Sequence, residues 1–263
     1  TNGSTKSRNP DITQISGNDF GTFNLLEYSE EFDQSYWGKA NLTVISNAAV
    51  APDGTLTADK LVEGTNADFK QITSTVTYSN STTYTFSVYA KAAENDSVDL
   101  LFAGGGQYAT IEFNLTDGTA SAVGQNNTWS NISGISSYVG NGWYRCSITA
   151  TSSSAVTSNK VYIRNTNATD QGDGTSGIFV WGAQLEEGAF PTSYIPTQGS
   201  TATRAADVST SSSNTFGNSW YDQEQGTVFC RFSTSPQENS TLFAWTLYED
   251  EGNYLALRSA TGY

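Results

Sequence analysis

Residues 84–91 read YTFSVYAK, and apolar and polar side chains alternate along this stretch. Successive side chains of a β-strand point to opposite faces, so a period of two predicts a strand with one face toward a core. The same alternation recurs at residues 109–116, 143–150 and 178–185, whereas helical spacing is nowhere sustained. The four segments together predict a fold built from strands.

The segment 178–185 carries a specific expectation about its two faces. Its pattern places Phe179, Trp181 and Leu185 on the face toward the core and Gln184 on the opposite face.

Turn-forming sequences separate the alternating segments. Pro-Asp-Gly stands at 52–54, Asp-Gly at 117–118, Asn-Gly at 141–142 and Gly-Asp-Gly at 172–174. Such residues supply the positive φ angles and side-chain hydrogen bonds that tight turns need. Many short strands joined in this way are typical of an all-β sandwich, and we expect a jelly roll in particular.

Composition divides the chain into four parts. Residues 1–23 are polar and indicate a linker or N-terminal arm, and residues 24–207 contain the jelly-roll strands. Residues 208–219 are rich in Ser, Thr and Asn, as expected of a second linker. Strand patterns resume in 220–263, which is too short for an independent sandwich. This last part is either the start of a second, incomplete β-sandwich or a set of strands that complete a sheet with another chain.

The charge balance argues against two classes of partner. The formal net charge is −14, and only 12 residues are Lys or Arg, so nucleic acid and anionic membrane surfaces are poor partners. No apolar run approaches the length of a membrane span, and we expect no membrane insertion. Abundant Ser, Thr, Asn and Gly suit strand surfaces, turns and hydrogen bonds to sugar hydroxyls.

The chain has no His and only two Cys, Cys146 and Cys230. Without His, neither Ser-His-Asp nor Cys-His catalysis is possible, and the commonest ligand of zinc, copper and iron is missing. Cys146 falls on the core phase of its strand, and we expect it to be a buried free thiol rather than bridged to Cys230.

An ordered series of motifs spans most of the chain. It comprises NLL at 24–26, YW at 36–37, APDGT at 51–55, ADKL at 58–61, YTFSVYAK at 84–91, GWYR at 142–145, WGAQLEEG at 181–188, TSYIPT at 192–197 and TRAAD at 203–207. The series resembles the carbohydrate-binding-module-like jelly roll of bacteriophage tail fibres and virion proteins, notably those of marine and cyanobacterial phages. The segment after Asp207 resembles the start of a concanavalin-A- or laminin-G-like domain.

This resemblance implies an extracellular location on a virion. It implies contact with host-surface glycans and with other virion proteins, in a homo-oligomer for which a trimer is favoured. It supplies no catalytic residues.

Aromatic rings that stack on sugars, flanked by amides that bind hydroxyls, are the expected ligand-binding chemistry. We expect Tyr108 to lie in the Gly-rich loop 104–108 and Trp129 to lie with Gln125 and Asn127 in a polar loop or open face at 125–129, so these four residues are the candidate glycan contacts. The alternative, which we favour for each ring taken singly, is an aromatic side chain that covers an edge of the core.

Further polar residues allow either a ligand or a structural role. Gln184 and Glu186 could bind a ligand or pair with Arg145 or Arg204. Arg145 is expected to anchor a carboxylate or a backbone carbonyl inside the fold.

Asp170 and Asp173 lie in an Asp- and Gly-rich turn that could hold a structural calcium ion, although it does not match the EF-hand pattern. A solvated turn is the alternative, and we expect no other cofactor.

We expect a binding protein and not an enzyme. The adjacent pairs Glu30-Glu31 and Glu186-Glu187 cannot serve as paired catalytic carboxylates, because neighbours on a strand point to opposite faces. The leading hypothesis is therefore a virion fibre segment that contacts host glycans. The two alternatives are a structural spacer or capsid-decoration protein without a ligand, and an accessory carbohydrate-binding module of a secreted bacterial polysaccharide hydrolase.

Overall fold

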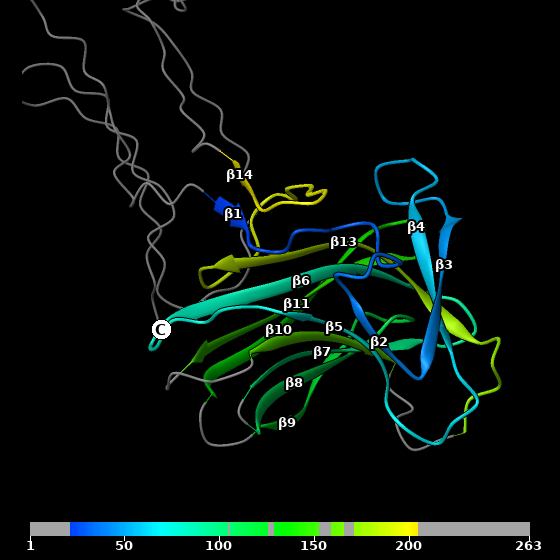
Figure 1. The fold of residues 1–263 in the computed structure, drawn as a ribbon, viewed down its shortest axis with the longest axis horizontal. Coiled ribbons are helices and arrows are strands. Elements are labelled where there is room, and N and C mark those ends of the chain that lie inside the picture. The colour runs from blue at the N-terminus through cyan, green and yellow to red at the C-terminus, as the bar shows by residue number, and fades with distance from the viewer. Residues whose placement is uncertain (1–21, 105, 126–128, 153–158, 166–170, 205–263) are drawn as a thin grey trace, which may run out of the picture. The chain divides into compact units, whose positions relative to one another are not determined.

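A computed structural model describes residues 22–104, 106–125, 129–152, 159–165 and 171–204 (Figure 1). Every helix or strand assigned within these ranges is a β-strand, so this part of the chain has no helix that could cross a membrane. The strands are β1 (Thr22–Asn24), β2 (Gly38–Ala40), β3 (Leu42–Ala49), β4 (Ala58–Glu63), β5 (Lys70–Thr75), β6 (Thr83–Ala92), β7 (Ser97–Gly104), β8 (Gln107–Asn114), β9 (Ala120–Gln125), β10 (Trp129–Gly140), β11 (Trp143–Ser152), β12 (Lys160–Asn165), β13 (Gly177–Glu187) and β14 (Ala202–Arg204).

Two six-stranded antiparallel sheets pack face to face, which confirms the predicted all-β sandwich of jelly-roll type. The first, here the β6 sheet, has the order β10-β11-β6-β13-β4-β3, and the second, the β7 sheet, has the order β2-β5-β12-β7-β8-β9. Figure 1 shows β6, β11 and β13 in one layer and β7, β8 and β9 in the other. β1 pairs with β14, so the two ends of the described sandwich lie side by side. The predicted linker 208–219 and partial domain 220–263 lie outside the described residues.

The core follows the alternation seen in the sequence. Phe86 and Val88 of β6 are fully buried against the inward side chains of β7, which include Leu100 and Phe102. Fully burying an apolar side chain of this size contributes about 1.5–3 kcal/mol. Cys146 lies in the same core as a free thiol, as predicted, and burial raises its pKa to about 12.

The expectation for segment 178–185 is wrong in one respect, because β13 contains a β-bulge. Its register against β6 shifts between Trp181 and Gln184, and Gly182 has a φ of 62°. A Cβ atom at Gly182 would lie 2.9 Å from Cδ2 of Tyr89, so the bulge needs glycine on both counts. The extra residue puts Leu185 in the main core but leaves Phe179 and Trp181 on the outer face of the β6 sheet.

Trp181 is nevertheless buried, because the chain folds over this outer face. It packs with Trp143 in a second apolar cluster, and its ring centroid lies 4.5 Å from that of Tyr194. The Trp181 indole N–H donates to Oγ1 of Thr57 over 3.0 Å, and that of Trp143 donates to the carbonyl of Val50 over 3.1 Å. These contacts occupy the rings that this face would otherwise offer to a ligand. The β7 sheet carries no such cluster among the described residues.

Candidate functional site

The outer face of the β7 sheet carries polar and aromatic side chains at its centre. On β7, Leu100 and Phe102 point into the core, so Asp99 and Leu101 project outward. The same alternation on the neighbouring strands defines what we call the polar sheet face. Its members are Gln71 and Thr73 of β5, Tyr162 and Arg164 of β12, Asp99 and Leu101 of β7, and Tyr108, Thr110 and Glu112 of β8.

Strand register aligns four of these side chains in one row. Gln71 lies opposite Arg164, Arg164 opposite Asp99, and Asp99 opposite Glu112. Neighbouring strands are about 4.8 Å apart, so the row crosses four strands in about 14 Å. A parallel row of Thr73, Tyr162, Leu101 and Thr110 lies beside it. Residues from four separate stretches of sequence thus lie side by side on one face of the sheet, where Asp99, Leu101 and Thr110 are buried and their neighbours are partly exposed.

Arg164 is held in a fixed orientation on this face. Its Nε and Nη2 atoms donate to Oε1 of Gln71 over 3.1 and 3.0 Å. Its guanidinium carbon lies 3.9 Å from the centroid of the Phe69 ring, which is a cation–π contact. Burial lowers the pKa of Arg164, and the negative charge of Asp99 opposes that shift. Arg164 stays charged and presents its remaining N–H groups in a preset geometry.

Asp99 is a buried acceptor that the fold leaves unsatisfied. Its exposed fraction is 5%, and within the part of the chain that the structure describes its Oδ1 atom has no hydrogen-bond partner. Such an atom costs about 1–3 kcal/mol. Burial raises the pKa of Asp99 to about 7, Arg164 acts in the opposite direction, and Glu112 adds to the rise.

Of the two predicted stacking rings, only Tyr108 is exposed. Its exposed fraction is 41%, and a Cβ atom on Gly124 of the adjacent strand would lie 3.0 Å from its Cε2 atom. Trp129 is 5% exposed and stacks on Phe102 at 5.1 Å between ring centroids, with an edge contact to Tyr78. Trp129 is thus packed in the core, which favours the alternative of an aromatic side chain that covers an edge of the core.

The two amides of the predicted site are placed less favourably. Gln125 is exposed at the end of β9, but it lies opposite Ala109, which faces the core, and not opposite a member of the polar sheet face. Asn127 lies outside the described residues.

Gln184, Glu186 and Arg145 have structural roles. Oε1 of Gln184 accepts the backbone N–H of Ile195 over 2.7 Å, and Glu186 accepts the backbone N–H and the hydroxyl of Thr192. Arg145 donates to the carbonyl of Thr192 over 2.6 Å, so the predicted carbonyl anchor is confirmed. All three side chains bind the segment that follows β13.

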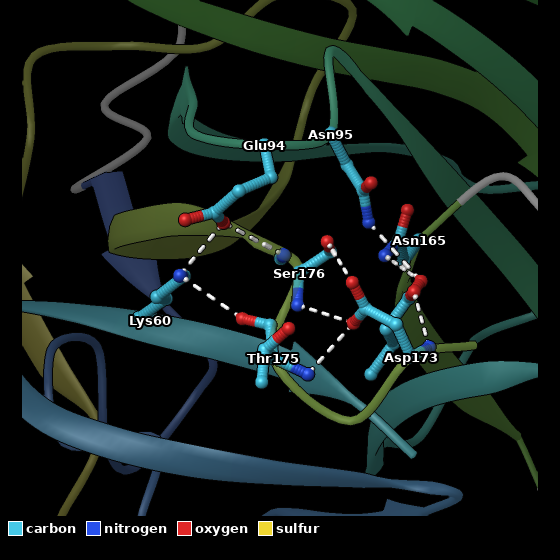
Figure 2. Close-up of polar contacts among 9 residues, drawn as sticks. Lys60, Glu94, Asn95, Asn165, Asp173, Thr175 and Ser176 are labelled. Carbon is cyan, nitrogen blue, oxygen red and sulfur yellow. Dashed lines mark hydrogen bonds and ion pairs between the residues drawn. The ribbon is translucent and has the colours of Figure 1, made fainter. Parts of the chain in front are cut away.

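The turn proposed for calcium is held together by internal hydrogen bonds (Figure 2). One carboxylate oxygen of Asp173 accepts the N–H groups of Thr175 and Ser176, each over 2.7 Å, and the other accepts the Ser176 hydroxyl over 2.7 Å. These bonds lower the pKa of Asp173 well below its usual value. Asp173 therefore stabilises a turn without needing an ion, while Asp170 lies outside the described residues.

Charged side chains near this turn also have hydrogen-bond or ion-pair partners within the protein. Glu63 accepts the backbone N–H of Asp173 over 3.1 Å and the side-chain amides of Asn95 and Asn165 over 3.2 and 3.3 Å. Lys60 forms an ion pair with Glu94 over 2.7 Å. Across the described ranges, no group of three or more His, Cys, Asp or Glu residues could hold a metal ion.

The sequence pattern did not single out Asp99, Arg164, Gln71 or Glu112. A local signal existed, because each occupies the polar phase of an alternating segment. The pattern cannot show that β12 inserts between β5 and β7, which is what assembles the row.

No family model matches the chain, and no curated protein matches it significantly. One similar solved structure is the enzymatically active domain of tailspike protein 4 of bacteriophage CBA120, at 14% identity and a TM-score of 0.39, covering 62% of this chain and 21% of that one. The present chain thus spans about a fifth of that chain.

Two others are carbohydrate-binding modules. The CBM22-1 xylan-binding domain of Paenibacillus barcinonensis Xyn10C has 11% identity and a TM-score of 0.35, with 65% of this chain and 94% of that chain covered. TmCBM61, solved with β-1,4-galactotriose, has 10% identity and a TM-score of 0.27, with coverages of 60% and 97%. At such low similarity, function has to be inferred from the side chains of the polar sheet face.

Proposed function

We propose that this chain is a non-catalytic glycan-binding module of a virion appendage, such as a tail fibre, and that the polar sheet face contacts the glycan. The observation that carries the proposal is the row Gln71–Arg164–Asp99–Glu112, with the exposed ring of Phe69 against Arg164 and the exposed ring of Tyr108 further along β8. A sugar ring offers hydroxyl groups to such a row and an apolar C–H face to an aromatic ring. The motif series over residues 24–207 supports the virion setting.

The face is prepared for binding before a ligand arrives. Gln71 and Phe69 hold the Arg164 guanidinium in place, so little side-chain entropy is lost when a sugar binds. Gly124 lets the Tyr108 ring lie against β9. Because the face is a strand surface, a single site is expected to bind weakly. A homo-oligomeric fibre, for which we expect a trimer, would reach useful avidity by repeating it.

A glycosidase role for the same face is less well supported. The structure brings Asp99 and Glu112 together on adjacent strands, and the raised pKa of Asp99 resembles that of a general acid. A glycosidase, however, places its two carboxylates on either side of the scissile bond. Asp99 and Glu112 project from one face of one sheet and would approach a sugar from the same side. Their arrangement favours binding over hydrolysis.

A glycan array with four proteins tests the proposal. They are the wild type, Tyr108→Ala and Tyr162→Ala on the polar sheet face, and Tyr138→Ala as a matched control, since Tyr138 is an exposed tyrosine on β10 of the other sheet. We expect binding to one glycan class that both face variants weaken at least tenfold and the control retains.

Each other outcome contradicts part of the proposal. Binding that survives both face variants would place the site elsewhere. Silence from a folded wild type would favour the structural spacer. Release of reducing sugar from the bound glycan would show an enzyme.

A further inference from the structure

We propose that Asp99 and Arg164 form a diol-binding pair that selects uncharged sugars and rejects sugars carrying a carboxylate. This inference rests on the proposed glycan binding and names the ligand class of the same face. The two side chains are direct cross-strand neighbours on β7 and β12.

The pair combines one acceptor with one donor at the spacing of neighbouring strands. Asp99 is buried, its Oδ1 atom is shielded and has no partner among the described residues, and the carboxylate can accept a hydroxyl proton through its other oxygen, Oδ2. Arg164 uses Nε and Nη2 toward Gln71, and its other N–H groups can donate to the next hydroxyl along. Adjacent hydroxyls on a sugar ring present one donor and one acceptor together. A vicinal diol therefore satisfies both side chains at once.

Charge around the pair disfavours an anionic sugar. Glu112 lies directly opposite Asp99 on β8, and Arg164 lies opposite Asp99 on β12. The row therefore contains two carboxylates and one guanidinium. The next cation on β12, Lys160, is four residues from Arg164, or about 13 Å along the strand, which exceeds the screening length of about 8 Å at physiological salt. At pH 8, where Asp99 is ionised, a sugar carboxylate over it would meet net negative charge in a partly dehydrated setting.

The pairing of Asp99 with Glu112 also indicates a binding role. Like charges directly opposite each other on adjacent strands are unfavourable, and so is a buried carboxylate oxygen without a donor. Neither arrangement helps the sandwich fold. Both are accounted for if a ligand supplies hydroxyl protons to this row.

The proposal implies that affinity for a neutral sugar rises with pH. Asp99 is the stronger acceptor of a hydroxyl proton when it is ionised, and its pKa is about 7. The titratable or charged groups that face it are Arg164 and Tyr162 on β12 and Glu112 on β8. The ionised fraction goes from about a tenth at pH 6 to about nine-tenths at pH 8, so affinity should increase about tenfold at most.

The test is an array on which each neutral oligosaccharide is printed beside its uronic acid or sialylated counterpart. It is read at pH 6 and pH 8 with the wild type, Asp99→Asn and Glu112→Gln, after each protein is shown to be folded. We expect neutral glycans to bind, more tightly at pH 8. Asp99→Asn should weaken binding more than tenfold and abolish the pH effect. Glu112→Gln should raise the binding of acidic glycans relative to that of their neutral counterparts.

Two results separate this inference from the proposed function. In the first, Tyr108→Ala abolishes binding, but the wild type binds acidic glycans as strongly as neutral ones or binds equally at both pH values. This result would overturn the diol-binding pair and leave glycan binding intact. In the second, the wild type binds no glycan, which would overturn both the diol-binding pair and the proposed function. The comparison of wild-type binding at pH 6 and pH 8 needs no variant, so it tests the diol-binding pair even if Asp99→Asn does not fold.

Discussion

Replacing Asp99 by Asn should stabilise the sandwich at pH 8 while it weakens ligand binding. The folded-state pKa of Asp99 is raised from 3.8 to about 7, chiefly by burial. As pH rises from about 4 to about 7, the unfolded chain releases this proton and the folded chain retains it. The free energy of unfolding of the wild type therefore falls across this window and is flat above it.

The size of the effect follows from the pKa shift. About three pH units correspond to about 4 kcal/mol, which is an upper bound because buried sites relax on ionisation. We expect a gain of about 1–3 kcal/mol for Asp99→Asn at pH 8. For a domain of this size that corresponds to about 3–8 °C in Tm. Near pH 4 the two proteins should melt at nearly the same temperature, since Asp99 is then neutral in the folded state and only about 60% ionised in the unfolded chain.

Calorimetry from pH 4 to pH 8 measures the difference, with Asp59→Asn as the matched control. Asp59 is also buried, and burial raises its pKa to about 6, but its oxygens accept the backbone N–H groups of Phe32 and Asn47 over 3.0 and 2.9 Å. An amide nitrogen at position 59 would face one of these donors, so the control should lower Tm at pH 4. A wild-type profile that Asp99→Asn leaves unchanged, or a lower Tm at pH 8, would refute the account of Asp99.

Three further substitutions or treatments have expected outcomes. Gly182→Ala should destabilise the sandwich by about 1–3 kcal/mol in urea unfolding, because the residue has a φ of 62° and its Cβ would meet Tyr89; an unchanged midpoint would contradict the bulge. Trp129→Ala should cost about 3–5 kcal/mol through loss of its stacking on Phe102 and its burial, so any binding defect should track unfolding; a folded, binding-deficient variant would restore Trp129 as a contact. EDTA should leave Tm unchanged if the turn at Asp173 works without calcium, whereas a calcium-dependent rise of several degrees would show a metal site there.

Much of the fold could be predicted because its signals are local. Alternation at residues 84–91 needs only the geometry of one strand, and the Asn-Gly and Asp-Gly pairs need only the geometry of one turn. The buried thiol at Cys146 followed from the same period of two. Tyr108 is exposed, but it lies on β8 and not in the Gly-rich loop in which the pattern placed it.

The errors have one physical cause, which is that strand pairing joins residues distant in sequence. The bulge at Gly182 is a register shift relative to β6, and a single strand cannot reveal it. Trp129 stands beside polar residues in the sequence yet packs on Phe102 of β7, because the first residue of β10 reaches into the core. The local pattern indicated a core face for Trp181 and a polar loop for Trp129. Packing instead put Trp181 on the outer face of the β6 sheet and Trp129 in the core.

The sequence by itself determined the strands, the turns, the core phase and the absence of histidine chemistry, since each depends on residue type and near neighbours. Only the tertiary structure assembles the polar sheet face, which we propose as the binding site. Asp99 and Arg164 are ordinary polar positions on two separate strands until the order β5-β12-β7-β8 places them opposite each other. Asp99 is buried, has an unsatisfied oxygen and lies opposite Glu112 only because of this strand order. These properties depend on which strands pack together and not on the sequence of any single strand.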